Sequence, residues 1–256
     1  LSALGRYYLY FAHHNGKYIR MAYADKLEGP WSIYKGGVFH IDELSAGTSH
    51  VASPEVLWDE HQMCRLYVHA PTKESEGKEQ RTFLARGADG INFYDITNIP
   101  LAPAYLRVWQ HEGWYYGIVR GGRLYRSIDG ISPFTKGPNP ISNLNARHVA
   151  LYKGGTSVLI IYGSSIGDTP EHIWRCIINC TGDWATWKIY KKRKILESEK
   201  EWEGSQLPLL KSKEGMAVGA LHELRDPHIY VEEGTLYLTY SIAGEQGIGI
   251  AKLNFI

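Results

Sequence analysis

The sequence predicts an all-β protein, a five-bladed β-propeller, and three observations support this fold class. A unit made of an aromatic strand, a turn and a second strand recurs five times, beginning at Tyr7, Arg65, Trp114, Val158 and Leu236. In the first four copies the unit continues into a turn that contains Asp and is closed by Trp or Phe. The strands are short, and a small sheet buries both of its faces only when neighbouring blades cover it.

The blades follow one another along one predicted domain, residues 1–256. Alternation of apolar and polar residues and the turn residues between strands set their limits. The predicted blades are residues 1–40, 49–99, 103–141, 147–195 and 225–253. The four Asp turns join Asp25 to Trp31, Asp89 to Phe93, Asp129 to Phe134 and Asp183 to Trp187.

The first blade is predicted to hold strands at residues 7–13, 18–24 and 31–34. Asn15 and Gly16 separate the first two strands, and both residues tolerate the positive φ of a tight turn. The other units have a strand upstream of the equivalent point, so we expect the innermost strand of this blade to be missing from this numbering. A signal peptide can therefore be neither seen nor excluded.

Residues 196–224 follow no strand pattern and separate the fourth blade from the fifth. The segment is too long for an ordinary connection, and long ordered loops tend to be functional or mobile. We expect it to shape one mouth of the central channel of the propeller.

Composition limits the partners of the protein. The chain is 44% hydrophobic, which suffices for a large core, and its net charge is +1, which argues against a nucleic-acid surface. No apolar run approaches the roughly 18 to 20 residues that span a bilayer. The three cysteines, Cys64, Cys176 and Cys180, show no zinc spacing and are interpreted as packing residues. We expect a carbohydrate partner, no nucleic acid and no membrane, and the oligomeric state stays open.

Ionisable residues occupy the segments expected to form innermost strands, where apolar residues are the rule. Four segments show this, at residues 49–56, 102–107, 146–150 and 224–229. An unpaired buried charge is costly, so these residues either pair with one another or face a wet pocket. Innermost strands of a propeller converge on the central channel, which makes these residues the first candidates for a site.

The sequence of the predicted fifth blade, residues 225–253, resembles that of a known family. Residues 225–230, with the sequence RDPHIY, and the strand at 236–238 are similar to the Asp-Pro strand motif of the five-bladed propeller glycosidases such as glycoside hydrolase family 43. Residues 24–31 resemble the segment of the same superfamily in which a strand leaves the pocket and turns outward. Residues 147–149 resemble the strand on which that family carries a channel histidine. Only the Asp-Pro segment matches a catalytic motif specifically.

The resemblance implies hydrolysis of a glycosidic bond by carboxyl groups, one acting as acid and one as base. Asp226 is the best single candidate, as a base or as a carboxylate that positions or tunes the acid. Glu55 and Glu203 are candidates for the other roles, and Glu203 is the more attractive acid because Glu-Gly phrases mark the acid in the family. The family's base normally lies on the first blade's innermost strand, so the catalytic set can be incomplete in this numbering.

Histidines and arginines form a second group of candidates. They fall at strand ends or on predicted inner strands, where Arg can bind a carboxylate or sulfate of an acidic sugar through two parallel hydrogen bonds. With Trp202 of the irregular segment added, the candidate substrate-binding residues are His13, His14, His50, Arg107, Arg147, His148, Trp202, His222 and Arg225. No pair of histidines has a specific metal-binding spacing. No cofactor is expected, with a structural calcium in the channel left open.

The leading hypothesis is a glycoside hydrolase acting on a plant or algal poly- or oligosaccharide, exo-acting and inverting. Two alternatives keep the fold: a polysaccharide lyase acting on uronate-containing glycans, and a sugar-binding propeller without catalysis. The compartment is not determined by the sequence, and a secreted or periplasmic location is favoured. The sugar and the linkage also stay open.

Overall fold

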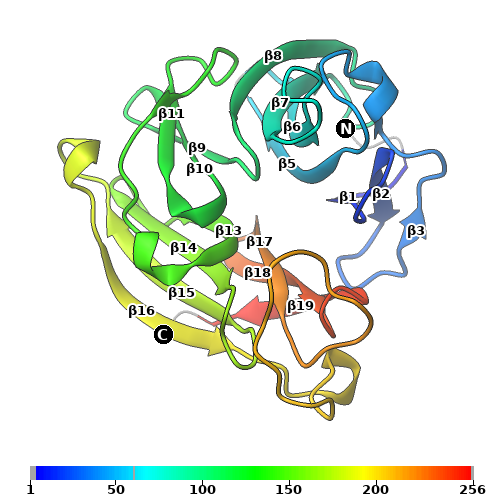
Figure 1. Cartoon of the computed structure of the whole chain (residues 1–256), viewed down its shortest axis with the longest axis vertical. Helices are drawn as coiled ribbons and strands as arrows, with labels where there is room; N and C mark the ends of the chain where they lie inside the picture. The colour runs from blue at the N-terminus through cyan, green and yellow to red at the C-terminus, as the bar shows by residue number, and fades with distance from the viewer. Residues whose placement is uncertain (1–3, 60, 255–256) are drawn as a thin grey trace. The chain divides into compact units, whose positions relative to one another are not determined.

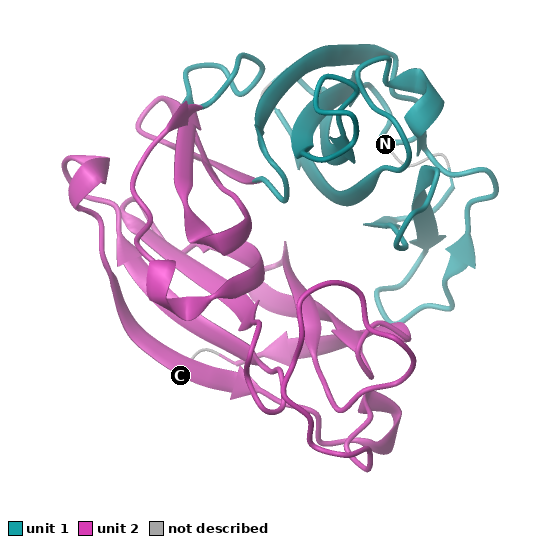
Figure 2. Ribbon diagram, viewed as in Figure 1, with its two compact units in different colours: residues 1–106, 127–134 teal, residues 107–126, 135–256 magenta. Residues whose placement is uncertain are grey.

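The computed structural model describes residues 4–59 and 61–254, and these form nineteen strands in five sheets (Figure 1). The fold class is the predicted one, an all-β five-bladed β-propeller. The chain divides into two compact units (Figure 2): unit 1 is residues 1–106 and 127–134, and unit 2 is residues 107–126 and 135–256. Residues 1–3, at the start of the predicted first blade, lie outside the described part.

The first sheet of unit 1 confirms the strand positions predicted for the first blade. It contains β1 (Tyr7–Phe11), β2 (Tyr18–Ala24), β3 (Ser32–Ile33) and β4 (Phe39–His40). The connection after β1 is longer than a two-residue hairpin: Gly16 N donates to His13 O, and only Asn15 of the predicted turn pair has a positive φ.

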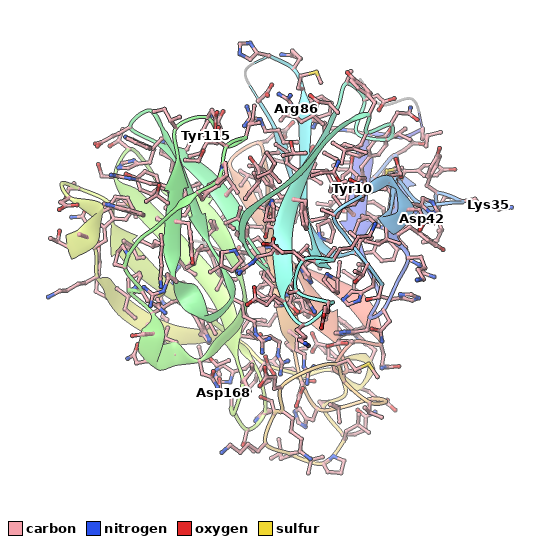
Figure 3. All side chains as sticks on the ribbon, turned by 45° about the horizontal axis from the view of Figure 1, so that its top comes forward. Tyr10, Lys35, Asp42, Arg86, Tyr115 and Asp168 are labelled. Carbon is pink, nitrogen blue, oxygen red and sulfur yellow. The ribbon has the colours of Figure 1, made fainter. Side chains whose placement is uncertain are left out.

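The second sheet of unit 1 contains β5 (Ala52–Trp58), β6 (Cys64–Pro71), β7 (Gln80–Gly87) and β8 (Asp95–Pro103). Every residue of β6 is buried, because this strand lies between β5 and β7 and is covered on both faces. The two sheets share one apolar core. The hydroxyl of Tyr10, which is labelled in Figure 3, donates to the carbonyl of Gly90 over 2.7 Å and joins β1 to the β7–β8 connection.

Unit 2 contains three sheets. Their strands are β9 (Arg107–His111), β10 (Trp114–Ile118), β11 (Leu124–Ser127) and β12 (Thr135–Lys136), then β13 (Ala146–Lys153), β14 (Val158–Ser165), β15 (Ile173–Asn179) and β16 (Ile189–Leu196), then β17 (Arg225–Glu232), β18 (Thr235–Ile242) and β19 (Gly247–Leu253). The limits of the predicted blades therefore agree with the sheets to within a few residues. Two apolar clusters form the core, and Gly163 is needed in one of them because a Cβ there would lie 2.5 Å from ring atoms of Trp174.

Five short 3-10 helices occur in the connections of the described chain. They are η1 (Ile41–Glu43), η2 (Arg120–Gly122), η3 (Ser142–Leu144), η4 (Trp184–Thr186) and η5 (Glu201–Glu203). The irregular segment predicted at 196–224 contains η5 and, beyond it, no strand.

Three of the four predicted Asp turns, those at Asp89, Asp129 and Asp183, are closed by the carboxylate itself. Asp89 accepts hydrogen bonds from the backbone N–H groups of Ile91 and Asn92, at 2.9 and 2.8 Å, and Asp183 accepts one from Ala185 at 3.0 Å. The closing aromatic residues Phe93, Phe134 and Trp187 are buried. The recurring Asp is therefore a local turn device of the blade.

A bulge recurs in the first strands of three sheets. In β17, Arg225 is paired with Ser241 and His228 with Thr239, so two residues of β17 oppose one of β18. The same shift occurs in β5 and in β13. Asp226 in β17 and Ser53 in β5 each have a positive φ, 49° and 48°, and each precedes a proline. A bulge re-aims side chains, and in β17 it re-aims Asp226.

Candidate functional site

Asp226 lies in the bulge of β17, and a neighbouring strand fixes its carboxylate. The hydroxyl of Ser241, on β18, donates to Oδ2 of Asp226 over 2.9 Å. The side chain of Asp226 keeps 29% of its surface exposed, so its carboxylate is accessible to solvent. This combination of a held carboxylate and open access is what a reacting group requires.

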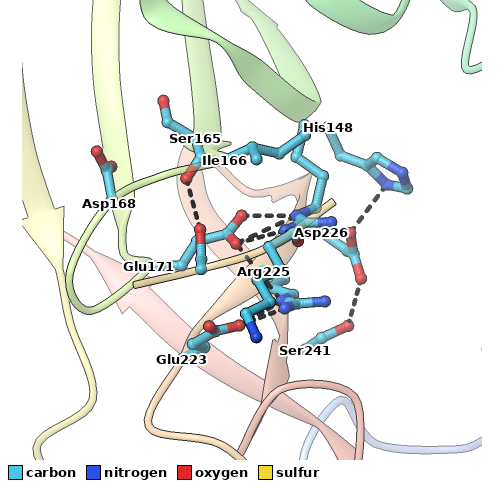
Figure 4. Close-up of polar contacts among 12 residues, drawn as sticks. His148, Ser165, Ile166, Asp168, Glu171, Glu223, Arg225, Asp226 and Ser241 are labelled. Atoms are coloured by element: carbon cyan, nitrogen blue, oxygen red, sulfur yellow. Dashed lines mark hydrogen bonds and ion pairs between the residues drawn. The ribbon is translucent and has the colours of Figure 1, made fainter. Parts of the chain in front are cut away.

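His148 lies on β13, which packs beside β17 within unit 2. Its Nδ1 is 2.9 Å from Oδ1 of Asp226 and its side chain is 17% exposed (Figure 4). The sequence placed His148 among substrate-binding residues and Asp226 among catalytic ones, and the structure brings the two side chains into direct contact. We call them the His148–Asp226 pair.

The pKa of Asp226 is lowered. Burial works in the opposite direction, but it is outweighed by the charge of His148, by the hydrogen bonds from His148 and Ser241, and by the charge of Arg147. Asp226 is therefore ionised across the neutral range. Such a carboxylate can accept a proton or orient another group, and it is not a proton donor at neutral pH.

His228, two residues after Asp226 on β17, is exposed. Although part of the side chain reaches solvent, the protein around the ring displaces much of its water and lowers its pKa to about 4, and the charge of Arg107 contributes in the same direction. The ring is therefore neutral at neutral pH. Arg107, a predicted substrate-binding residue, is buried and donates from Nε to the carbonyl of Val149 over 3.2 Å.

Arg147 and Arg225, also predicted to bind substrate, are buried among carboxylates. Figure 4 shows Arg225 between Glu171 and Glu223. Arg147 holds both oxygens of Glu171, with Nε to Oε1 and Nη2 to Oε2 each at 2.8 Å. Arg225 donates from Nε to Glu223 over 2.7 Å and from Nη1 to Glu245 over 2.9 Å. We call these five residues the buried ion network.

The ion network contains more carboxylates than guanidinium groups. The pKa of Glu223 is raised, chiefly by burial and further by the charge of Glu171, while Arg225 and Arg147 act in the opposite direction. The two guanidinium groups are therefore committed to carboxylates of the protein. Their predicted contact with an acidic sugar stays a prediction.

Glu203, the predicted acid, ends η5 and is buried. Its Oε2 accepts the backbone N–H groups of Glu199 and Lys200, each at 2.9 Å, and its Oε1 accepts the hydroxyl of Tyr240 at 2.8 Å. These bonds close the η5 turn and fasten it to β18. A role for Glu203 as acid stays a prediction.

Trp202 and His222 lie in the same irregular segment. Trp202 is 55% exposed, and Nδ1 of His222 is 3.0 Å from the carbonyl of Leu207. His222 therefore contributes to the internal structure of the segment, whereas Trp202 presents an aromatic face to solvent. Their roles in binding also stay predictions.

The remaining candidates belong to unit 1. Glu55 is buried on β5, two residues after the positive-φ Ser53. His13 and His14 are exposed in the connection before β2, and Nδ1 of His50 is 3.0 Å from the hydroxyl oxygen of Ser49. Burial lowers the pKa of His50, and the charges of His14 and Lys17 lower it further.

Among residues 4–59 and 61–254, no group of three or more His, Cys, Asp or Glu side chains is arranged to hold a metal ion. All three cysteines are buried and free, and burial raises the pKa of each thiol to about 12. They are therefore packing residues, as the sequence indicated. None of the helices in the described chain has the length and apolar character needed to cross a bilayer.

Sequence reasoning missed Ser241, Glu171, Glu223 and Glu245 as members of the site and its support. Ser241 follows the aromatic strand pattern of β18 without any motif, and Glu171 lies in the connection between β14 and β15. Their positions became informative only when β13, β17 and β18 were assembled. The one available signal was the repeated order Arg-His at 147–148 and Arg-Asp at 225–226.

No protein-family model matches the chain. Solved structures share its fold at low identity: a thermostable family-43 glycoside hydrolase (TM-score 0.69, 14% identity, covering 100% of this chain and 88% of that one) and an endo-arabinase from Bacteroides thetaiotaomicron (0.68, 13%, 97% and 89%). A family-43 β-xylosidase/α-arabinofuranosidase from a compost microbial metagenome, solved with xylotriose, is similar with a TM-score of 0.63 at 14% identity, covering 92% and 79%. These structures show the five-bladed propeller fold of the glycosidases.

A sequence relative is found in Acanthamoeba polyphaga mimivirus, where it is named "Uncharacterized protein R118". The two proteins are 34% identical over 272 residues, which cover 96% of this chain and 76% of the viral protein. At this identity and coverage the relationship extends over nearly the whole described fold. The chain belongs to the same family as this mimivirus protein, and its fold is that of the five-bladed propeller glycosidases.

Proposed function

We propose that the protein is a glycoside hydrolase that cleaves a glycosidic bond of a poly- or oligosaccharide, with Asp226 as an essential carboxylate. The observation that supports this most directly is the His148–Asp226 pair. Its two side chains come from neighbouring strands, meet at 2.9 Å and stay partly exposed. The likeness of the fold to family-43 glycosidases, which reaches a TM-score of 0.69, supports this reaction class.

The chemistry fits an ionised Asp226. Glycoside hydrolysis needs one group that protonates the leaving oxygen and one carboxylate that activates water or stabilises the transition state. Asp226, with its lowered pKa, suits the second role or the positioning role. His148 Nδ1 lies within hydrogen-bond distance of Asp226, so the two side chains can share or transfer a proton. Glu55 and Glu203 stay candidates for the proton donor.

The substrate panel follows from the neighbours. The structural neighbours include a β-xylosidase/α-arabinofuranosidase, an endo-arabinase and an endo-1,4-β-xylanase, so xylose- and arabinose-containing oligosaccharides are the first substrates to test. The panel extends to plant and algal polysaccharides. Product release is followed by chromatography, with Asp226→Asn as the decisive variant.

We expect turnover of Asp226→Asn to fall by roughly 100-fold or more, because a positioned acid–base or orienting group typically contributes that much. A loss of only a few-fold would remove Asp226 from the chemistry. Asp89→Asn is a matched control, since it neutralises an Asp whose hydrogen bonds serve a turn. Its turnover should stay within about two-fold of the parent protein.

Two finer features belong to the same proposal. Exo action predicts that mono- or disaccharides accumulate from the start of the reaction, and a ladder of longer fragments would contradict it. Inversion predicts that the first product has the opposite anomeric configuration to the bond cleaved. Proton NMR within the first minutes of reaction separates this from retention.

The same pair supports a second candidate, a polysaccharide lyase. An Asp that orients a His is also an arrangement for removing the proton next to a uronate. A lyase gives unsaturated products that absorb in the ultraviolet, and it consumes no water. Incubation with polyuronates therefore distinguishes the two reactions by absorbance. Binding without any product over long incubation would instead indicate a sugar-binding propeller.

A further inference from the structure

Two strands of unit 2 repeat the same order of side chains at the candidate site. On β13, Arg147 precedes His148, and on β17, Arg225 precedes Asp226. In each strand the arginine is buried and the next residue is partly exposed. His148 and Asp226 each lie in the bulge of their strand, so in both strands a buried arginine is followed by a partly exposed residue that the bulge re-aims.

The arginines of the two strands converge on one carboxylate, that of Glu171. The Glu171 side chain is completely buried. It receives Arg147 in a bidentate arrangement, and its Oε2 lies 3.5 Å from Nε of Arg225. Bidentate Arg–carboxylate pairs fix direction as well as distance. Glu171 therefore links β13 and β17 through Arg147 and Arg225, the residues directly before His148 and Asp226.

The same arginines also hold the irregular segment that precedes β17. Arg147 donates to the carbonyls of Lys213 and Gly215, at 2.5 and 3.0 Å, and Arg225 donates to Gly215 at 3.4 Å. Displacement of Arg147 would therefore release the segment as well as the strand. The buried ion network therefore contacts two parts of the molecule: the strands that carry the His148–Asp226 pair, and the backbone at Lys213 and Gly215.

We propose that Glu171 is a positioning residue, which sets the contact between His148 and Asp226 by joining the arginines that precede them on β13 and β17. The inference rests on the proposed function for its effect on turnover, and on geometry alone for its effect on the pair. Glu171 need not touch substrate. It acts through Arg147 and Arg225, whose strands present the two reacting side chains.

The first test is Glu171→Gln, which keeps the shape and removes the charge. In this variant Arg147 and Arg225 lose the charged acceptor that they share. We expect the nitrogen chemical shifts of the His148 ring, measured at one fixed pH, to move toward those of the Asp226→Asn variant, because the contact between the two side chains is loosened. On any glycoside that the parent protein hydrolyses, kcat should fall about tenfold while KM stays within about two-fold.

The matched control is Asp59→Asn in unit 1. Asp59 and Arg65 form another buried carboxylate–guanidinium pair, with side chains 4% and 6% exposed. Asp59→Asn removes a comparable ion pair, and the nitrogen chemical shifts of the His148 ring should stay at their parent values. Equal shifts in the two variants would show a general effect of lost stability and overturn the proposal.

A second variant guards against misfolding of Glu171→Gln. The double variant Arg147→Met with Glu171→Met removes both charges of the pair, so neither charge is left buried alone. Replacements of this kind are often tolerated. We expect the folded double variant to lose the slow exchange of the His148 ring proton that its bond to Asp226 protects. Parent-like exchange in it would overturn the proposal. If no glycoside is hydrolysed by the parent protein, the proposed function fails while these NMR results still decide the positioning role.

Discussion

Asp226 and Asp129 are two carboxylates with lowered pKa values and different kinds of partner. Asp129 accepts the backbone N–H groups of Ile131 and Ser132, each at 2.8 Å, and the hydroxyls of Ser127 and Ser132. Burial opposes the shift there too, and these hydrogen bonds outweigh it. Every donor to Asp129 lies within three residues along the chain.

The partners of Asp226 come from distant parts of the sequence. His148 lies on β13 and Ser241 on β18, and an imidazole can act as an acid or a base whereas a backbone amide does not. The comparison shows that a lowered pKa alone does not identify a reacting carboxylate. The kind of partner decides: backbone donors build a turn, and a titratable side chain from another strand makes proton transfer available.

The largest expected effect separates the two carboxylates by activity. Asp226→Asn should lower turnover by about 100-fold or more, while Asp129→Asn leaves turnover of the folded protein within about two-fold. Initial rates on the best xylo- or arabino-oligosaccharide measure both. Comparable losses of turnover in the two variants would contradict the distinction between a reacting Asp226 and a structural Asp129.

A variant of Glu203 tests whether this buried, hydrogen-bonded carboxylate serves the structure, as Asp129 does, or the reaction, as we propose for Asp226. Its three hydrogen bonds predict that Glu203→Gln lowers the free energy of unfolding by about 1 to 3 kcal/mol, since two backbone donors and Tyr240 lose a charged acceptor. Urea denaturation measures this. Unchanged stability with turnover lowered about 1,000-fold would instead assign Glu203 to the chemistry.

The stability effect expected for the turn is somewhat smaller. Asp129→Ala removes the acceptor of two backbone N–H groups and should cost about 1 to 2 kcal/mol of unfolding free energy, with unchanged turnover at low temperature. Asp25→Ala is the control, because Asp25 is exposed at the corresponding turn of the first blade. Equal costs at the two positions would mean that the hydrogen bonds of Asp129 are not the source of its effect.

Removal of the Ser241 hydroxyl is expected to have a modest effect. Ser241→Ala leaves His148 in place and takes one donor from Asp226, so the pKa of Asp226 rises and turnover falls a few-fold. The acidic limb of the pH–rate profile should move to higher pH. An acidic limb at its original position would show that Asp226 does not titrate in that limb.

The smallest effect concerns the acid stability of the turns. Folding lowers the pKa of Asp89 and of Asp129, so their stabilisation is complete above the unfolded pKa of about 4 and is lost as the pH falls toward the folded values. With both replaced by Asn, the free energy of unfolding should fall less steeply below about pH 4. Urea titrations at several pH values test this, and an unchanged slope would contradict it.

Local patterns sufficed to predict much of the fold. The aromatic strands, the Asp turns and the limits of the blades follow from alternation and turn chemistry within short windows, and the sheets confirm them. The positive φ at Asp226 and the bulge around it were not predicted, because they depend on the register between β17 and β18. The hairpin after β1 also differs, since its connection is longer than Asn15 and Gly16 alone indicate.

The candidate site was predicted in part. Asp226 was found through its Asp-Pro motif, and His148 through its place on a predicted inner strand. Glu171 and Ser241 were not found, because nothing in their own segments differs from ordinary surface sequence. The arginines were interpreted as anion binders; Arg147 and Arg225 have carboxylate partners within the protein, and their contact with a sugar stays a prediction.

The sequence by itself determined the five repeated blades, the turn carboxylates and the ionisable residues of the first strands, since these depend on neighbours along the chain. Only the tertiary structure decided which carboxylate meets a histidine and which arginine is neutralised. Those outcomes depend on which strands lie side by side. The contact between His148 and Asp226 joins residues far apart in sequence, and a local pattern has no means of specifying such a distance.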